Sequence, residues 1–365
     1  MDKGLELHGI FEFNDSFDYS DYKYEDDCDT GRFILAIWVP ILYSVAMVLG
    51  LTGNVLVLVV LWQKRRNWSM TDAFVLHLSI ADMLLLLTLP VWAVDSGKGW
   101  SFGSGLCKLT GVLFKINFYC SIFLLVCITL NLYISVVHTT QICSRTRPYV
   151  VQLICLVGWI FSLLLSIPDW IYLEAANVSE PEDNYKCVSQ YSPKESCMAC
   201  HLSSLVLGVL LPFIVVLYCF IRVLLQHRSK TGGLKQRAVQ VTFTLVLVFF
   251  ISWTPFNVVL LMDTFRFSPR KPAEFCENHR WTAVKSTAIL CFLHCCLNPL
   301  IYFGFSEKFR HWILTIIKFG SCAVDSGDYF LWDSREFHSA TPVPQEENGA
   351  LQPMNNIQQQ TDEML

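Results

Sequence analysis

Charge is what this sequence has least of. Only 16% of its 365 residues are charged, whereas 53% are hydrophobic, and a typical soluble domain carries about 25% charged residues. Apolar stretches of about 20 residues, the length that crosses a bilayer, recur along most of the chain. The composition therefore excludes a single soluble core and predicts an integral membrane protein.

Catalytic and transport signatures are also missing from the sequence. The apolar segments contain no nucleophile–base pair and no metal-ligand cluster, so an enzyme is not expected, and the neighbouring His294 and Cys295 are interpreted as packing residues. A transporter or channel is disfavoured, because the segments show no evident internal repeat and no ladder of titratable groups. No basic stretch precedes an apolar run at the N-terminus, so the first membrane helix is expected to direct its own insertion.

Seven apolar segments predict an all-α fold, a seven-transmembrane helix bundle. They cover residues 33–62, 70–94, 105–137, 149–173, 202–225, 238–265 and 281–303. Around them we expect an acidic extracellular tail (1–32), the bundle itself (33–303), a short amphipathic helix on the inner membrane surface (304–320) and a disordered cytoplasmic tail (321–365). Membrane lipid is thus an expected partner of both the bundle and the amphipathic helix.

The distribution of Lys and Arg predicts the orientation of the bundle. Basic residues gather in alternate loops, namely Lys64, Arg65, Arg66, Arg145, Arg147, Arg228, Lys230, Lys235 and Arg237. Such loops are cytoplasmic in membrane proteins, which places the N-terminus outside. Two glycosylation sequons, at Asn14 and Asn177, then fall on the outer side, which agrees with this orientation of a plasma-membrane protein. A third sequon, at Asn67, falls in a cytoplasmic loop and is expected to be silent.

The N-terminal tail is strongly acidic. Residues 1–32 hold ten acidic and three basic side chains, a net charge of −7, which predicts a basic partner and not nucleic acid. Tyr19, Tyr22 and Tyr24 lie close to Asp26 and Asp27 in this tail. Taken by itself, a charge run of this kind favours a solvated, disordered tail.

Polar residues inside the predicted membrane segments form one notable group. Asp82 lies midway along the second segment, and its candidate partners are Asn54, Asn117, Ser121 and Asn298. Buried ionisable groups in membranes are costly and are often functional. We expect a hydrated pocket that holds a small cation such as sodium; the alternative is a polar cluster that only packs the helices.

Several motifs together resemble those of a known receptor family. Those typical of rhodopsin-class G-protein-coupled receptors are Gly53-Asn54, Leu78-Ser79-Ile80-Ala81-Asp82, Trp253-Thr254-Pro255 and Asn298-Pro299-Leu300-Ile301-Tyr302. Those that narrow the resemblance to CXC chemokine receptors are Thr88-Leu89-Pro90, Phe102 to Lys108, Asn117-Phe118-Tyr119 and His294 to Pro299. The resemblance spans about residues 28–320 and implies a chemokine as ligand, with arrestin and a G protein as cytoplasmic partners.

The resemblance also implies two disulfides and a set of ligand contacts. Cys107 would pair with Cys187, and Cys28 with Cys276, whereas Cys197 and Cys200 have no counterpart and are either free or paired with each other. In the family, tail tyrosines such as Tyr19, Tyr22 and Tyr24 are often sulfated and grip the chemokine core. Deeper contacts with the chemokine N-terminus would come from Trp92, Asp95, Tyr119, Asp169, Asp263 and Lys285.

Lys115 is a less usual feature of the third segment. It lies eight residues beyond Cys107, about 12 Å along a helix. At that depth we expect the ammonium to face a cavity or one of the carboxylates of Asp95, Asp169 and Asp263. The alternative is a lysine that extends its charged end to the membrane interface.

The largest departure from the family is at the inner end of the third segment. Where the family has Asp-Arg-Tyr, this chain has Asn131-Leu132-Tyr133, 25 residues or about 37 Å from Cys107 to Leu132. In the family the arginine is held by the acid at rest and meets the G protein when active, and leucine replaces neither role. The other switch residues, Trp253, Pro255, Asn298, Pro299 and Tyr302, are present.

These observations favour a chemokine-binding receptor with weakened G-protein coupling, acting as a scavenger or decoy. The second hypothesis is a conventional receptor whose coupling tolerates Leu132 and which drives calcium signalling and leukocyte chemotaxis. A transporter or channel is the third.

Overall fold

The fold was determined as a computed structural model. It describes residues 27–63, 68–137, 148–177, 185–191, 194–227, 233–266, 273–305 and 310. Seven candidate spans pass the length and hydropathy of a membrane helix, and they cover residues 37–63, 70–98, 103–137, 149–172, 196–226, 236–265 and 282–305. The predicted all-α seven-helix bundle is therefore confirmed.

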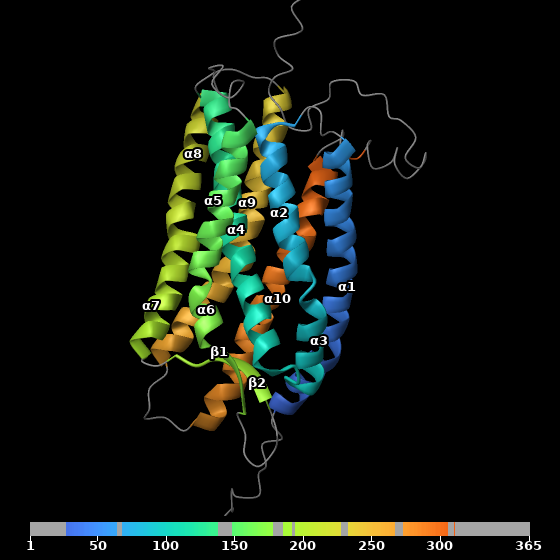
Figure 1. Ribbon diagram of the computed structural model, residues 1–365, viewed down its shortest axis with the longest axis vertical. Coiled ribbons are helices and arrows are strands. Elements are labelled where there is room, and N and C mark those ends of the chain that lie inside the picture. The colour runs from blue at the N-terminus through green and yellow to red at the C-terminus, as the bar shows by residue number, and fades with distance from the viewer. Residues whose placement is uncertain are drawn as a thin grey trace, which may run out of the picture.

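The helices run side by side as a bundle (Figure 1). The elements are α1 (Asp27–Gln63), α2 (Met70–Leu86), α3 (Leu89–Lys98), α4 (Gly103–Val137), α5 (Pro148–Leu165), α6 (Ile167–Tyr172), β1 (Leu173–Asn177), β2 (Tyr185–Ser189), α7 (Lys194–Leu205), the π-helix η4 (Val206–Leu210), α8 (Leu211–His227), α9 (Gly233–Arg266) and α10 (Ala273–Phe305). Three spans are composite, because α2 continues into α3, α5 into α6, and α7 through η4 into α8.

Prolines mark two of these breaks. Pro90 and Pro168 each occupy the first turn of the new helix, α3 and α6, where a missing N–H group costs nothing because it would have no helical partner. Thr88, just before α3, donates its hydroxyl to the carbonyl of Leu85 at 2.7 Å. Each of these two spans thus contains a break between two helices and still crosses the membrane as one segment.

The elements differ most from the predicted segments at the beginnings of three helices. Helix α1 begins at Asp27, inside the range that we assigned to the N-terminal tail; α7 begins at Lys194, eight residues before the predicted fifth segment; and α10 begins at Ala273. Polar first turns are invisible to hydropathy, which detects only the part of a helix that lies in lipid. The predicted amphipathic helix (304–320) lies almost wholly outside the described residues.

An antiparallel β-hairpin of β1 and β2 covers one end of the bundle (Figure 1). Leu173 pairs with Ser189 and Ala175 with Cys187 in its register. The sequence analysis did not predict this hairpin, since both strands are short and mixed in polarity. We call this end the hairpin end and the other the opposite end.

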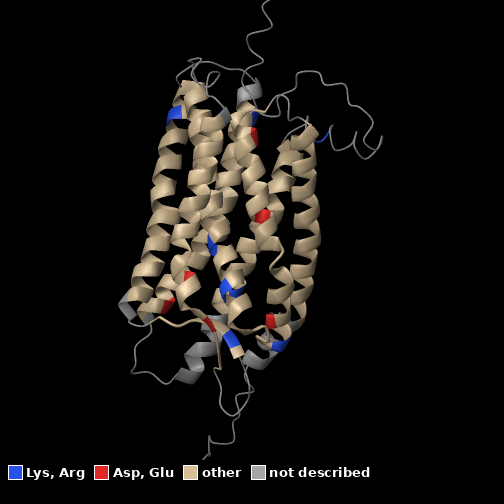
Figure 2. Cartoon of the chain, viewed as in Figure 1, with Lys and Arg blue, Asp and Glu red and all other residues tan. Residues whose placement is uncertain are grey.

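Helix α4 is the central element of the bundle, in contact with α2, α5, α8 and α9. Large apolar side chains point outward from the peripheral helices, and Trp62, Ile214 and Leu225 are each at least 64% exposed in the isolated chain. Charged residues are sparse along the bundle, and the acidic ones lie mainly toward the hairpin end (Figure 2). An apolar outer surface of this kind is what lipid solvates, as expected for a multi-pass protein of the plasma membrane.

Candidate functional site

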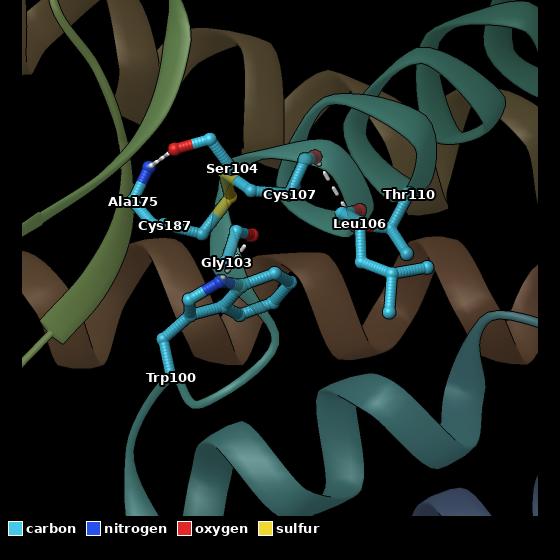
Figure 3. The surroundings of a disulfide bond; sticks show 8 residues. All are labelled: Trp100, Gly103, Ser104, Leu106, Cys107, Thr110, Ala175 and Cys187. Atoms are coloured by element: carbon cyan, nitrogen blue, oxygen red, sulfur yellow. Dashed lines mark hydrogen bonds between the residues drawn. A yellow bond between two sulfur atoms is a disulfide. The ribbon is translucent and has the colours of Figure 1, made fainter.

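A disulfide between Cys107 and Cys187 fastens the hairpin to the start of α4, with the two Cα atoms 5.5 Å apart. Nearby, the Ser104 hydroxyl accepts a hydrogen bond from the Ala175 amide at 3.2 Å, and the Trp100 indole donates to the Gly103 carbonyl at 2.9 Å (Figure 3). The predicted pairing of Cys107 with Cys187 is confirmed. The side chains of Cys28 and Cys276 lie outside the described residues.

Behind the hairpin, two of the predicted ligand contacts form an ion pair. Lys285 of α10 lies 3.2 Å from Asp95 of α3, and its side chain is 39% exposed against 10% for Asp95. Trp92, on the same helix as Asp95, packs its ring 5.9 Å from Trp100. A partly solvent-accessible pair of this kind contributes little to stability, and its Lys285 end is the more exposed of the two.

Deeper in the bundle, the side chains of Lys115 and Tyr119 converge on the hydroxyl of Ser204. The Lys115 ammonium donates to Ser204 Oγ at 3.2 Å, and Tyr119 shares a hydrogen bond of 2.9 Å with the same atom. All three side chains are buried, and Lys115 is 8% exposed. Asp169 of α6 lies within electrostatic range of Lys115. Lys115 therefore does not extend to the membrane interface but turns inward toward α7. Asp263, another predicted contact, is half-buried on α9.

Cys197 and Cys200, which had no assigned role, are both free thiols. Cys197 Sγ lies 3.7 Å from His201 Nδ1 and 3.7 Å from Thr264 Oγ1, while the Thr264 hydroxyl and the His201 ring are 2.7 Å apart. These contacts connect α7 to α9. The thiol of Cys200 instead faces Tyr191, which follows the hairpin.

An aromatic cluster lies beneath the Lys115 region. Trp253 of α9 packs 4.9 Å from both Phe114 and Phe118 of α4. Phe118 fits against Gly208 in η4, where any Cβ atom would clash with its ring. The π-helical turn and its glycine thus let α4 and α8 approach closely around the predicted switch residue Trp253.

The polar core lies at mid-bundle, centred on Asp82. Its carboxylate accepts hydrogen bonds from Asn117 at 2.9 Å and from Asn298 at 2.8 Å. Asn54 does not reach Asp82 but donates to the carbonyls of Gly50 and Cys295. All four residues predicted to surround Asp82 are buried, and among the described residues Asn54 Oδ1, Ser121 Oγ and Asn298 Oδ1 have no hydrogen-bond partner.

His294 and Cys295 also belong to this core, although the sequence analysis treated them as packing residues only. Donor atoms of Asp82, His294 and Cys295 all lie within 4.8 Å of one another. A carboxylate, an imidazole and a thiol form a donor set that suits a metal such as zinc. The signal in the sequence was their place four and three residues before Asn298, which puts them beside Asp82 once α10 packs on α2.

Two prolines in long helices accompany the predicted switch residues. Pro255 lies inside α9 and Pro299 inside α10. A Cβ atom on Gly53 of α1 would lie 2.8 Å from Pro299 Cβ, so glycine is needed for α1 to pack against this kink. Tyr302 is 1% exposed at the inner side of the kink. The structure thus places both prolines inside long helices, and their hinge role stays a prediction.

At the opposite end of α4, the departure from the family has a clear structural form. Leu132 is 8% exposed and belongs to the same hydrophobic core as Val136, Val223 and Leu245. Asn131 donates a 3.0 Å hydrogen bond to Thr71 at the start of α2, and the ring of Tyr133 lies 6.1 Å from that of Tyr218 on α8. The site that holds an arginine in the family is here an apolar contact.

The predicted tail contacts Tyr19, Tyr22, Tyr24 and Asp26 and the sequon at Asn14 lie outside the described residues, and the side chain of Asp27 is likewise not described. Asn177 is exposed at the end of β1.

Comparison with known proteins identifies the family. Residues 53–302 match the family described as 7 transmembrane receptor (rhodopsin family). The chain is 41% identical over 284 residues to the C-X-C chemokine receptor type 3 of Bos taurus, covering 76% of each chain. It is 38% identical over 315 residues to the human receptor of that name, covering 83% of this chain and 85% of the relative. The motifs quoted in the sequence analysis also resemble those of the type 3 receptor. The chain belongs to the chemokine receptors of the rhodopsin family, which are receptors and not enzymes.

Proposed function

We propose that this receptor binds a basic chemokine at the hairpin end, which faces the cell exterior, and internalises it without efficient G-protein activation. In this role it is a scavenger or decoy that removes chemokine. The single observation that carries the proposal is Leu132, a buried apolar side chain at the position where the family presents an arginine to the G protein.

The energetic consequence is large. Loss of a charged, multidentate contact at a buried interface costs on the order of 2–5 kcal/mol. At about 1.4 kcal/mol per decade, coupling falls by a factor of roughly 30 to several thousand. Ligand binding is little affected, because Leu132 and the hairpin end lie at opposite ends of α4.

The structure also offers an observation in favour of a conventional signalling receptor. The hinge residues around Trp253, Pro255 and Pro299 are retained, and Asn131 has a substitute tether in Thr71. A G protein that docks on other inner residues would then still be activated. The two candidates differ only in the output of the conformational change, so they predict different cellular responses to the same bound chemokine.

The deciding experiment measures chemokine uptake and calcium release side by side in transfected cells. We expect uptake without a calcium response from the unmodified receptor. The double variant Asn131→Asp, Leu132→Arg should gain a calcium response, while Asn131→Asp alone, the matched control, should not. A robust calcium response from the unmodified receptor would reject the scavenger role and favour the conventional one.

The proposed ligand contacts come from two regions, the acidic N-terminal tail and the helices at the hairpin end. We propose that the acidic tail with Tyr19, Tyr22 and Tyr24 holds the basic chemokine core, and that Asp95, Asp169 and Asp263 receive its N-terminal segment. Asp95, Asp169 and Asp263 lie on α3, α6 and α9 toward the hairpin end, where each carboxylate could pair with a basic group of the ligand.

We also propose that sodium binds beside Asp82. The carboxylate and the unpartnered oxygens of Ser121 and Asn298 supply oxygen ligands of the kind that a hard cation prefers. Sodium chloride, compared with choline chloride, should raise the thermal stability of the purified receptor, and Asp82→Asn should abolish that difference. If sodium stabilises the Asp82→Asn variant as much as the unmodified receptor, sodium does not bind at Asp82. The polar residues around Asp82 would then only pack the helices.

A further inference from the structure

Lys115 is the only lysine or arginine that is buried in the part of the chain that the structure describes. An ammonium carries three N–H donors, and one of them is used by Ser204 Oγ at 3.2 Å. Lys285, by contrast, is half-buried and has Asp95 at 3.2 Å. Among the described carboxylates none is close enough to form an ion pair with Lys115. The deepest cation of the hairpin end is thus bound to a neutral hydroxyl.

The surroundings of Lys115 point to the interior of the bundle. The ammonium is within electrostatic range of Asp169 on α6, His201 on α7 and Cys291 on α10. A buried charge is costly unless an opposite charge and hydrogen bonds compensate it. Asp169 supplies part of that compensation from a distance, and two N–H donors remain for a further acceptor.

We propose that Lys115, Tyr119 and Ser204 form a subsite that binds a carboxylate group. The ammonium supplies the opposite charge, and the two hydroxyls, joined at 2.9 Å, supply hydrogen bonds to the carboxylate oxygens. The proposal rests on the ligand-binding role proposed for the hairpin end, and it adds a specificity that acidic residues alone would not give. A region rich in carboxylates selects basic ligands, whereas this subsite requires an acidic group at one defined depth.

The neighbouring residues indicate what carries the carboxylate. Phe114, directly before Lys115, packs its ring 4.9 Å from Trp253, 5.0 Å from Phe256 and 5.5 Å from Phe292. An aromatic group beside the carboxylate would add to this cluster. The ligand is therefore an aromatic carboxylate, either a free small acid or an acidic residue next to an aromatic one in the N-terminal segment of a protein ligand.

The first test uses the purified full-length receptor and two probes, indole-3-propionate and its neutral amide. We expect saturable binding of the acid, measured by thermal shift, and at least roughly tenfold weaker binding of the amide, as for the loss of a buried charged contact. Lys115→Met should abolish the preference for the acid. The matched control is Lys108→Met, a half-buried lysine two turns earlier on α4, which should retain the preference. Equal binding of acid and amide by the unmodified receptor overturns the proposal.

The second test has the opposite sign and does not depend on the stability of Lys115→Met. Asp169→Asn removes the carboxylate that competes for Lys115, so the acid should bind roughly threefold more tightly or better, while binding of the amide stays unchanged. A purely structural role of Asp169 would weaken both probes equally. Weaker binding of the acid alone in Asp169→Asn also contradicts the subsite.

A peptide pair distinguishes the two sources of the carboxylate. N-acetyl-Phe-Glu-amide should bind more tightly than N-acetyl-Phe-Gln-amide if an acidic side chain of a protein ligand is accepted. Binding of indole-3-propionate without this peptide preference assigns the subsite to a free acid, and absence of both effects rejects it. Chemokine uptake is measured separately in cells, so failure of uptake with intact acid binding counts against the proposed function and not against the subsite.

Discussion

Helix α4 buries a charged side chain toward one end and an apolar side chain toward the other. Toward the hairpin end it buries a cation, Lys115, among hydroxyls with a carboxylate in range, and 17 residues later, about 25 Å along the helix, it buries Leu132 in an apolar core. At the position of Leu132 the family has an arginine, which meets the G protein. The same helix thus buries polar groups toward the hairpin end and an apolar side chain at the opposite end.

The comparison places the proposed ligand subsite and the altered Asn131–Leu132 position at opposite ends of a single helix. The hairpin end is held by a disulfide, by the Ser104–Ala175 hydrogen bond and by the Lys285–Asp95 pair. At the opposite end the Asn131–Thr71 hydrogen bond crosses from α4 to α2. Substitutions at one end should therefore leave the function of the other end largely intact.

The largest expected effect is at the hairpin end. Cys107→Ala opens the 80-residue loop that the disulfide closes, and for a loop of that size the loss of stability is about 4 kcal/mol. We expect chemokine binding at the cell surface to be lost and the melting temperature of the purified receptor to fall. Cys200→Ala, a free thiol of the same end, should have little effect. Normal binding by Cys107→Ala would show that the hairpin does not need its anchor.

An intermediate effect is expected from a charge placed at the opposite end. Leu132→Arg puts a guanidinium into an apolar core and should lower stability by roughly 2–4 kcal/mol. Adding Asn131→Asp supplies a carboxylate on the same helix and should recover part of that loss. Thermal denaturation of the single and double variants gives the two values. If the single variant is as stable as the unmodified receptor, Leu132 does not lie in a closely packed apolar core.

The smallest effect concerns the tether of Asn131. Asn131→Ala removes the 3.0 Å hydrogen bond to Thr71 and should lower stability by about 1 kcal/mol. Ser135→Ala is the matched control, because the Ser135 hydroxyl bonds only to the Leu132 carbonyl within α4, and we expect a smaller change in melting temperature. Chemokine binding should be the same in both variants. Equal destabilisation by the two would mean that the bond between α4 and α2 adds nothing beyond a local contact.

The number of membrane spans was readable from the sequence because the bilayer imposes a minimum apolar length on each helix. Seven such lengths predicted seven spans, and the family motifs predicted the Cys107–Cys187 pairing that the structure contains. The polar first turns of α7 and α10 were missed for the same reason, since hydropathy reports the lipid-facing part of a helix and not its full extent. Asn131 and Leu132 could be located from the sequence, but their contacts could not.

The sequence by itself determined the number of spans, the family and the loss of the arginine, because each depends on residue type and spacing along one chain. Only the tertiary structure decided which distant residues meet. It brought Ser204 to Lys115, joined His294 and Cys295 to Asp82, and turned Val206–Leu210 into a π-helix in which Gly208 admits Phe118. The physical reason is that a side chain's partners are set by how helices rotate and pack against one another, and every apolar helix of similar length leaves that rotation open until its neighbours are in place.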